Sequence, residues 1–274
     1  IDYTSAINDI IVTFGPGGSS TATGTDVGLD FLDNIENATT GSGNDTFNTA
    51  DDSSNIFDGG AGTGDTYVYT GSDTDAITVN YDGSDGTVSS AGMDTDTVLN
   101  IENYTTGGGD DIFEIADNNS NTLDGGAGND TYIYTGSSNA DITVTYDGTT
   151  GTVSSSGMST DTVNNIENYT TGSGDDIFNI TDANDNIINA GAGNDTTNVG
   201  GSAASNTFTV VRTGSNVTVT GTGIGNDTYN SIENINITGG IGDDVVNLTE
   251  SSNNIVYGNG GTKEVIKVVK NSNA

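Results

Sequence analysis

The chain has no cysteine and no histidine, and its 274 residues include only one proline, Pro16. Without cysteine it can have neither a disulfide framework nor a thiolate nucleophile. Without histidine, Ser-His-Asp and Cys-His catalysis are excluded, and zinc loses its usual ligands. The chemistry left to the side chains is that of oxygen ligands.

Basic residues are also scarce. Lys and Arg number 4 against 39 Asp and Glu, a formal net charge of −35. Such self-repulsion opposes a compact state unless cations neutralise it, and calcium is the obvious candidate. A polyanion cannot release counterions from another polyanion, so we expect no nucleic-acid partner, while a cationic surface remains an alternative. High charge with few apolar residues is also typical of disorder, but the repeats described next argue against it.

Long apolar runs are missing as well. No run approaches the roughly 18 residues that a membrane span requires. The chain begins at Ile1, with no initiator Met and no signal-like segment. We therefore expect a mature chain or a fragment, with no membrane span.

An internal repeat organises the chain. The tripeptide Ile-Glu-Asn begins at Ile35, Ile101, Ile166 and Ile232, at intervals of 66, 65 and 66 residues. A pair of β-rich segments precedes the tripeptide, as in "AITVNYDGSDGTVSS". The interval predicts a single elongated array, and drift in the first and last copies is typical of repeats at the ends of a stack. The predicted repeats span 1–74, 75–140, 141–205 and 206–274.

A finer period runs inside each repeat. Apolar residues recur every nine or ten positions, which is one short strand plus one tight turn, so two steps form a coil of roughly 19 residues. The segments are rich in Thr, Val, Ile, Tyr and Phe, and no helical period is visible. We expect an all-β stack of coils with these core positions: Phe47, Phe57, Tyr67; Phe113, Leu123, Tyr132; Phe178, Ile188, Thr197; Val246, Val256, Val265.

A second ladder lies between the glycine loops of each repeat. An acid is followed four residues later by an amide in all four copies. We favour a structural turn in which these side chains bond to the backbone, and the alternative is a set of ligands on the opposite edge of the solenoid. The ladder consists of Asp51, Asp117, Asp182 and Glu250, with Asn55, Asn121, Asn186 and Asn254.

Seven loops combine glycine with acid side chains, at 40–48, 59–67, 106–114, 125–133, 171–179, 190–198 and 239–247. The loop at 125–133, "GGAGNDTYI", matches the calcium-binding nonapeptide Gly-Gly-x-Gly-x-Asp-x-apolar-x in full, and the others are near matches. The candidate calcium ligands are Gly41, Gly43, Asp45, Gly59, Gly60, Asp65, Gly107, Gly109, Asp111, Gly125, Gly126, Gly128, Asp130, Gly172, Gly174, Asp176, Gly191, Gly193, Asp195 and Asp244.

Calcium explains this composition. The ion takes six to eight oxygens from carbonyls and carboxylates, and glycine lets a bare carbonyl turn inward. One loop cannot supply them all, so we pair loops one coil apart: Asp45 with Asp65, Asp111 with Asp130, and Asp176 with Asp195. In the fourth repeat the partner of Asp244 would be Lys263, so that site is lost or the lysine substitutes for the ion. Plain turns without a metal are the alternative.

These loops resemble the RTX family, the hemolysin-type calcium-binding repeats of secreted bacterial proteins, and the resemblance covers most of the chain. It implies a right-handed parallel β-solenoid, of β-roll or β-helix type, that is secreted and folds in extracellular calcium with several ions between adjacent coils. Three departures stand out. Long spacers interrupt the loops, the loop at 59 has an extra residue before Asp65, and the loop at 190 begins with Ala.

Three of the four basic residues, Lys263, Lys267 and Lys270, lie in the final segment "GTKEVIKVVKNSNA". One hypothesis is that this end abuts the acidic start of another copy, near Asp2 and Asp9, in a head-to-tail contact that propagates as a fibre. The alternative is that the lysines protect an exposed solenoid end from random pairing.

The function we expect is structural: a calcium-stabilised extracellular subunit of a cell-surface layer or matrix filament. The chain is wholly repeat, which leaves no room for a catalytic domain, so we expect no enzyme. The alternative is the repeat region of a larger secreted adhesin or toxin. Ice binding and polysaccharide lyase activity fit less well, because no threonine occupies the third loop positions and Arg212 is a lone basic residue. Tyr104 and Tyr169 fit a core better than a platform for a surface polysaccharide.

Overall fold

A computed structural model describes residues 1–72, 74–137, 139–200, 208–221, 223–238, 243–248, 254–257 and 265–268. Every regular element within these ranges is a β-strand, as the sequence predicts. No helix long and apolar enough to cross a membrane occurs in this described part. The chain divides into two compact units, Ile1–Gly136 with Met158–Ile166, and Ser137–Gly157 with Glu167–Ala274.

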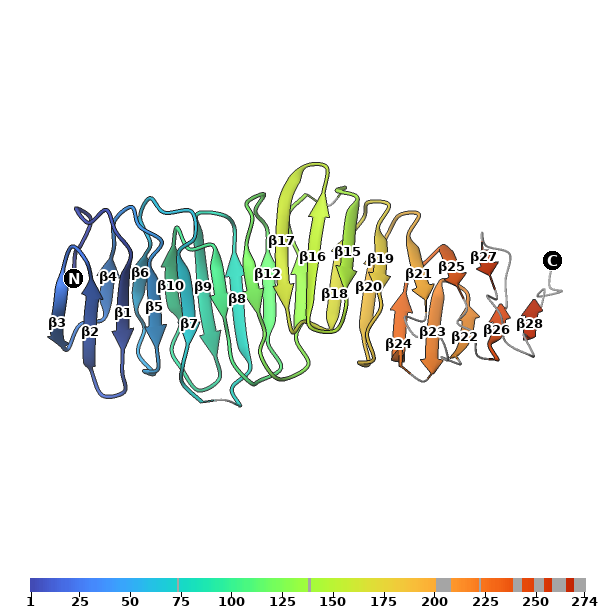
Figure 1. Cartoon of the computed structure of the whole chain (residues 1–274), viewed down its shortest axis with the longest axis horizontal. Helices are drawn as coiled ribbons and strands as arrows, with labels where there is room; N and C mark the ends of the chain where they lie inside the picture. Colours follow the sequence, from blue (N-terminus) through green and yellow to red (C-terminus); the bar gives the residue numbers. More distant parts are fainter. Residues whose placement is uncertain are drawn as a thin grey trace. The chain divides into compact units, whose positions relative to one another are not determined.

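The first unit has two facing layers of short strands (Figure 1). Its first sheet has the order β4 (Asn37–Thr39), β6 (Ile56–Asp58), β10 (Asp96–Leu99), β9 (Asp85–Ser90), β8 (Ile77–Tyr81), β12 (Ile112–Ile115) and β14 (Thr131–Tyr134). Its second sheet has the order β3 (Gly28–Asp33), β2 (Ser19–Gly24), β1 (Ile10–Phe14), β5 (Thr46–Thr49), β7 (Thr66–Tyr69), β11 (Asn103–Thr105), β13 (Thr122–Asp124) and β17 (Met158–Asn164).

The second unit is built in the same way. One sheet has the order β18 (Asn168–Gly172), β20 (Ile187–Gly191), β24 (Gly225–Asn230), β23 (Asn216–Gly221), β22 (Phe208–Thr213), β26 (Val245–Leu248) and β28 (Val265–Val268). The other has the order β16 (Thr150–Ser155), β15 (Ile142–Tyr146), β19 (Ile177–Ile180), β21 (Thr196–Gly200), β25 (Asn234–Thr238) and β27 (Asn254–Tyr257).

Successive coils pair in parallel, as expected of a β-solenoid, but the pairing is not parallel throughout. β5 pairs with β7, and β12 with β14, in parallel register. Within the first unit, β8, β9 and β10 form an antiparallel meander, and so do β1, β2 and β3. The β-rich pair that precedes Ile-Glu-Asn is thus an antiparallel hairpin inserted into the coil, which a purely parallel solenoid does not contain.

Alternate strand residues point between the two layers and form a thin core. Phe47, Phe57 and Tyr67 are fully buried, with ring centroids 5.2 and 5.8 Å apart along the stack. The other predicted core positions through Val246 are also buried, whereas Val256 and Val265 are only half-buried. The predicted core ladder is therefore confirmed up to Val246. Tyr104 and Tyr169 are core residues as well.

The glycine-acid loops of the first unit alternate between its two edges. Loops 40–45 and 59–65 lead from the first sheet to the second, whereas loops 106–111 and 125–130 lead from the second sheet to the first. Because the connected strands of each sheet run parallel, the two directions of crossing lie at opposite edges. The meander β8–β10 adds one more crossing between the two sheets to the repeat. The glycine-acid loops of the next repeat therefore lie at the other edge.

Each Ile-Glu-Asn tripeptide follows a residue in left-handed conformation. The φ angles are 54° at Asn34, 53° at Asn100, 51° at Asn165 and 60° at Ser231. An asparagine is among the few non-glycine residues that adopt this conformation readily. The sharp turn directs the following isoleucine into the core in repeats two to four, where it is fully buried.

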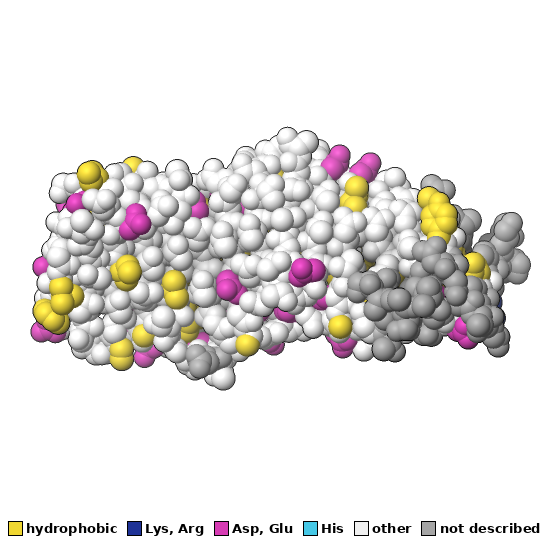
Figure 2. Space-filling model, viewed as in Figure 1, with side chains coloured by type: hydrophobic (Ala, Val, Ile, Leu, Met, Phe, Trp, Pro, Cys, Tyr) yellow, Lys and Arg dark blue, Asp and Glu magenta, His cyan; other side chains and the backbone are white. Residues whose placement is uncertain are grey.

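Outside the core, most of the face in Figure 2 is neutral, with single acidic side chains scattered between.

Candidate cation sites in the glycine-acid loops

The aspartates predicted to pair across adjacent coils do lie together. The backbone N–H of Ile10 donates to Oδ1 of Asp45 over 2.7 Å, and the N–H of Asp45 donates to Oδ1 of Asp65 over 2.6 Å. The N–H of Asp65 donates in turn to Oε2 of Glu102 over 3.0 Å. Each carboxylate thus accepts a hydrogen bond from the backbone of the preceding coil. The acids of consecutive coils therefore form a row along this edge, called the file below.

The same file recurs in the next two repeats. Oδ1 of Asp111 accepts from Ile77, and the N–H of Asp111 donates to Oδ1 of Asp130, both over 2.7 Å. In the second unit the N–H of Asp176 donates to Oδ1 of Asp195 over 2.8 Å, and the N–H of Asp195 donates to Oε2 of Glu233 over 3.0 Å. One carboxylate oxygen of each pair member therefore has a structural use that needs no metal.

The second carboxylate oxygen is different. Oδ2 of Asp45, Asp65 and Asp195 is buried and accepts no hydrogen bond from any described residue, and these side chains are at most 1% exposed. Burial raises the pKa of Asp65 to about 7, reinforced by the nearby charges of Glu102 and Asp45. Burial likewise raises the pKa of Asp195 to about 7, with the neighbouring carboxylates of Asp176 and Glu233 adding to it. A buried oxygen of this kind needs either a proton or a cation.

Two glycines shape the space beside Asp65. A methyl group at Gly59 would lie 2.7 Å from Oδ2 of Asp65 and still closer to the carbonyl oxygen of Asn100. A methyl group at Gly62 would lie 2.5 Å from the same Oδ2 and closer to the carbonyl oxygen of Gly43. Carbonyl and carboxylate oxygens therefore gather around the side-chain positions that glycine leaves empty, and this donor set suits calcium.

The first candidate glycine of each earlier loop also bonds to the next coil. The carbonyl oxygen of Gly41 accepts from Ala61 over 2.8 Å, that of Gly107 from Ala127 over 2.8 Å, and that of Gly172 from Ala192 over 2.9 Å. A methyl group at Gly60, Gly126 or Gly191 would collide with these carbonyl oxygens. These glycines are thus required by close backbone stacking, with or without an ion.

The sites are not identical. In the third repeat, Oδ2 of Asp176 accepts from the hydroxyl of Thr171 over 2.5 Å. In the fourth repeat Asp244 is 3% exposed, and its carbonyl oxygen accepts from Val265 over 2.9 Å. Lys263, predicted to replace its partner aspartate, lies outside the described residues. Within the described ranges no group of three acidic side chains could hold a metal by itself, so backbone carbonyls would have to complete each site.

Sequence reasoning missed the glutamate of Ile-Glu-Asn as a member of this file. Glu102 and Glu233 cap the second aspartate of the preceding pair from one coil further on. The signal was present, because this glutamate recurs in every repeat at a fixed place. The glutamate is interpreted as a spacer residue only when the glycine-acid loops are considered without the tripeptide.

The acid-amide ladder forms a separate buried cluster on the opposite edge of each repeat. Nδ2 of Asn55 donates to Oδ1 of Asp51 over 2.9 Å and to Oδ1 of Asp96 over 3.0 Å, and the hydroxyl of Tyr67 donates to Oδ2 of Asp96 over 2.8 Å. Repeats two and three repeat the asparagine bridge with Asp117, Asn121 and Asp161, and with Asp182, Asn186 and Asp227. The favoured structural turn therefore has a side-chain bridge at its centre, with a third aspartate that the sequence did not reveal.

The fourth repeat departs from this cluster. Arg212, which is 1% exposed, occupies the position of Tyr81 in the second repeat. Its guanidinium donates to Oδ1 of Asn254 over 3.2 Å, to the carbonyl oxygen of Gly214 over 2.9 Å and to that of Ile232 over 2.5 Å. Arg212 thus links β22 to the turn that follows it, to Ile232 and to β27.

No protein-family model matches the chain, and no curated protein matches it at a significant level. The resemblance to RTX repeats therefore stands on the loops themselves.

Proposed function

We propose that the chain is a calcium-stabilised, secreted structural protein that assembles with other copies of itself into a surface layer or filament. Calcium ions would lie between adjacent coils, held by the aspartates and glycine carbonyls of the glycine-acid loops. A bound ion would neutralise carboxylates that otherwise repel one another and lock successive coils together.

The observation that carries this proposal is the set of buried carboxylate oxygens, at Asp45, Asp65 and Asp195, that accept no hydrogen bond from any residue the structure describes. Plain glycine-acid turns would leave both oxygens solvated or bonded. Instead one oxygen of each carboxylate accepts from the backbone, and at Asp65 the other oxygen borders the space left by Gly59 and Gly62. Such an arrangement is costly without a counterion and favourable with one.

The test is a calcium titration of the purified chain, followed by circular dichroism and by imaging of particles. We expect strand signal and thermal stability to rise with calcium and to fall on chelation, because an ion that binds only the folded state stabilises it by mass action. Magnesium is the control, because it is smaller and demands near-octahedral geometry. A chain equally folded with calcium, with magnesium and with chelator would contradict the proposal.

Assembly is a separate part of the proposal, supported by charge: an acidic body and three lysines in the last 12 residues. Polymers that form with calcium and dissolve on chelation are the expected outcome in the same titration. The alternative role is that of a repeat region inside a larger secreted adhesin or toxin. The length of the full gene product distinguishes this role from that of a self-assembling subunit.

Ice binding is a second candidate function, favoured by one observation that the loop positions did not reveal. On the outer face of the second sheet of the first unit, residues of consecutive strands lie in register in one straight row. The spacing between strands is about 4.8 Å, so small polar side chains repeat at about this interval along the row. The row is Thr46, Thr66, Asn103, Thr122 and Thr162.

The row can be tested by replacing Thr66 and Thr122 with tyrosine and measuring inhibition of ice recrystallisation. Loss of activity is expected if the flat row binds ice. Matched threonines on another strand, Thr218 and Thr220, are the control positions because both are exposed. A wild-type chain without any effect on ice would remove this candidate.

A further inference from the structure

An open cavity lies at one corner of the first repeat. It has a volume of about 370 Å³ and lies between the turn after β1, the turn after β3 and the acid-amide turn after β5. Its lining includes the only proline of the chain, Pro16. This corner lies at the edge opposite to the loops of Asp45 and Asp65.

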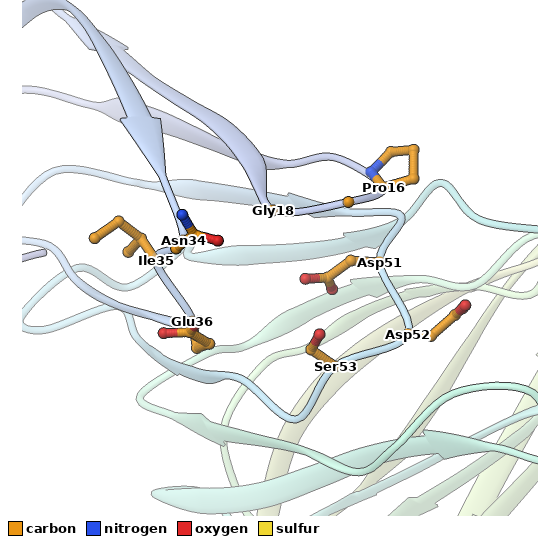
Figure 3. Close-up of a pocket in the computed structure, with 9 residues that line it drawn as sticks. Pro16, Gly18, Asn34, Ile35, Glu36, Asp51, Asp52 and Ser53 are labelled. Carbon is orange, nitrogen blue, oxygen red and sulfur yellow. The ribbon is translucent and has the colours of Figure 1, made fainter.

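Several polar side chains of the described residues line the cavity. Figure 3 shows the carboxylate of Asp51, the hydroxyl of Ser53 and the amide of Asn34 directed toward its centre, with Glu36 and Asp52 at its sides. Asp51 is only 8% exposed, and its Oδ1 accepts from Thr49 and Asn55. No described residue donates to its other oxygen, which faces the cavity.

The corresponding corner of the second repeat also holds a cavity, of about 320 Å³, but its chemistry differs, because Asn118 and Asn119 replace Asp52 and Ser53 on its turn. In the second repeat Nδ2 of Asn100 donates to Asp58 over 2.8 Å, and the glutamate that follows caps Asp65. The hairpin turn packs down as well, because a methyl group at Gly83 would lie 2.6 Å from Cβ of Asp117. Asn34 and Glu36, the equivalents in the first repeat, make no such side-chain bonds.

The fourth repeat shows what kind of group this corner accepts. Arg212 occupies the position of Phe14 in the first repeat and Tyr81 in the second. Its guanidinium donates there to Asn254, the equivalent of Asn55, and to the carbonyl oxygen of Ile232, the equivalent of Ile35. A nitrogen cation therefore fills the corner in one repeat, whereas Phe14 brings no polar atom to it in another.

We propose that this cavity receives a lysine side chain from the C-terminal segment of a second copy of the chain. An ammonium has three N–H donors, which suit the three oxygens of Asp51, Ser53 and Asn34. Ile35 and Pro16 border the aliphatic stem, and the rim acids Glu36 and Asp52 attract the charge.

A divalent metal fits this cavity less well. Only one buried carboxylate faces it, and no three acidic side chains of the described residues converge on a metal position. The volume is that of a side chain with solvent rather than of a single ion. Lysine is supplied by the chain itself, since Lys263, Lys267 and Lys270 stand near its end, and Lys267 on β28 is exposed.

The cavity is a different docking surface from the one near Asp2 and Asp9 that the sequence suggested. Asp2 accepts from the backbone of Thr4 over 2.9 Å, and Asp9 accepts from the backbone of Asn44 over 2.9 Å, so both carboxylates have structural roles. Asp51 differs from them, because it is buried and one of its carboxylate oxygens faces a cavity large enough for a side chain. The inference rests on the self-assembly part of the proposed function.

The experiment is zero-length crosslinking of the full chain with a carbodiimide, which joins an ammonium to a carboxylate as an amide. An equal mixture of ¹⁴N and ¹⁵N protein identifies links between copies. We expect mixed-isotope peptides that join a lysine of the last 12 residues to Glu36, Asp51 or Asp52. Links from these lysines only to other acids, or no links between copies, would overturn the inference.

Matched variants sharpen the test. Ser53→Phe fills the cavity but keeps every carboxylate, and Ser54→Phe adds the same group at the exposed neighbour outside the lining. We expect about a tenfold lower yield of these links in S53F, equivalent to roughly 1.4 kcal/mol, and an unchanged yield in S54F. Equal yields would contradict the inference.

A second variant keeps the test valid if S53F does not fold. Replacing Lys263, Lys267 and Lys270 with glutamine leaves the cavity intact and must abolish the links. Links to the cavity acids that persist through the N-terminal amine of Ile1 would contradict the inference. Circular dichroism with calcium on the same samples separates the two proposals, because a chain that ignores calcium but still links through the cavity refutes calcium-dependent folding alone.

Discussion

The backbone N–H of Asp45 donates to Oδ1 of Asp65 over 2.6 Å, while the Oδ2 atoms of both aspartates are buried and accept no hydrogen bond from the described residues. Asp65→Asn should therefore have opposite effects in the two states. Without calcium the amide removes a buried charge, and the free energy of unfolding at pH 8 should rise by roughly 1–3 kcal/mol, the scale of a buried polar group's desolvation. With calcium, the stabilisation by the ion should shrink.

Thermal melts of D65N with and without chelator measure both effects. Asp94→Asn is the control, because Asp94 is exposed and removes the same charge. Loss of stability in chelator, with an unchanged response to calcium, would contradict the cation site at this pair.

Gly62→Ala tests the space around the same carboxylate. The added methyl group would lie 2.5 Å from Oδ2 of Asp65 and closer to the carbonyl oxygen of Gly43. We expect destabilisation of about 1–3 kcal/mol from overpacking, together with weaker calcium binding by calorimetry. Gly157→Ala is the control, because a methyl group there meets no atom within 4 Å. Equal effects of the two substitutions would show that the cradle is not tightly packed.

A pH dependence follows from the buried acids that bridge to asparagine. Burial raises the pKa of Asp96 and Asp161 to about 6 and that of Asp227 to about 7. In the unfolded chain these carboxyls ionise near pH 4. The folded state therefore binds protons more tightly, and this contribution to stability is full below pH 4 and is lost as pH rises through 6 to 7.

In chelator, the melting temperature should accordingly fall between pH 5 and pH 8, and Asp227→Asn should flatten that fall. Circular dichroism melts across the range provide the measurement, with Asp185→Asn as the control, because Asp185 is an exposed acid next to Asn186, which bonds to Asp227. A melting temperature that rises with pH in chelator would contradict the assignment.

Two buried tyrosines provide a matched pair for the polar clusters. The hydroxyl of Tyr67 donates to Oδ2 of Asp96 over 2.8 Å, whereas the buried hydroxyl of Tyr81 has no hydrogen-bond partner among the described residues. Tyr67→Phe should cost about 1–3 kcal/mol, because it leaves a buried carboxylate oxygen unsatisfied. Tyr81→Phe should be neutral, and the first repeat already has Phe14 at this position. Chemical denaturation compares them directly, and a larger loss in Y81F would contradict the bonding pattern.

The sequence predicted the features that depend on local spacing. The nine- or ten-residue step places Phe47, Phe57 and Tyr67 on the inward faces of three successive strands, alternately from the two sheets, so their burial follows from strand geometry. The paired aspartates follow in the same way, because residues one coil apart must be neighbours. Both predictions needed only the period, which the repeat displays four times.

Features that depend on long-range topology were not predictable in this way. Asp96 bonds to Asn55 across 41 positions. An aspartate does stand five residues before each Ile-Glu-Asn, but this recurrence alone does not show that the aspartate reaches the acid-amide turn. The alternation of loops between edges depends on whether the β-rich pair is one crossing or an antiparallel meander of β8, β9 and β10. The 66-residue interval is the same in either case, so only the pairing of strands reveals it.

Arg212 provides the last prediction, because its role is invisible in the sequence, where it reads as an isolated charge. Its guanidinium bonds to the carbonyl oxygens of Gly214 and Ile232 and to Oδ1 of Asn254. Arg212→Ala should destabilise the chain by about 3–5 kcal/mol, the scale for removing one partner from a buried charged network. Arg212→Tyr should lose much less, because Tyr81 fills the same corner in the second repeat. Urea denaturation measures the loss of stability in both variants. Equal losses would show that tyrosine cannot replace arginine at this corner. The arginine of the fourth repeat would then no longer support a cation in the open corner of the first repeat.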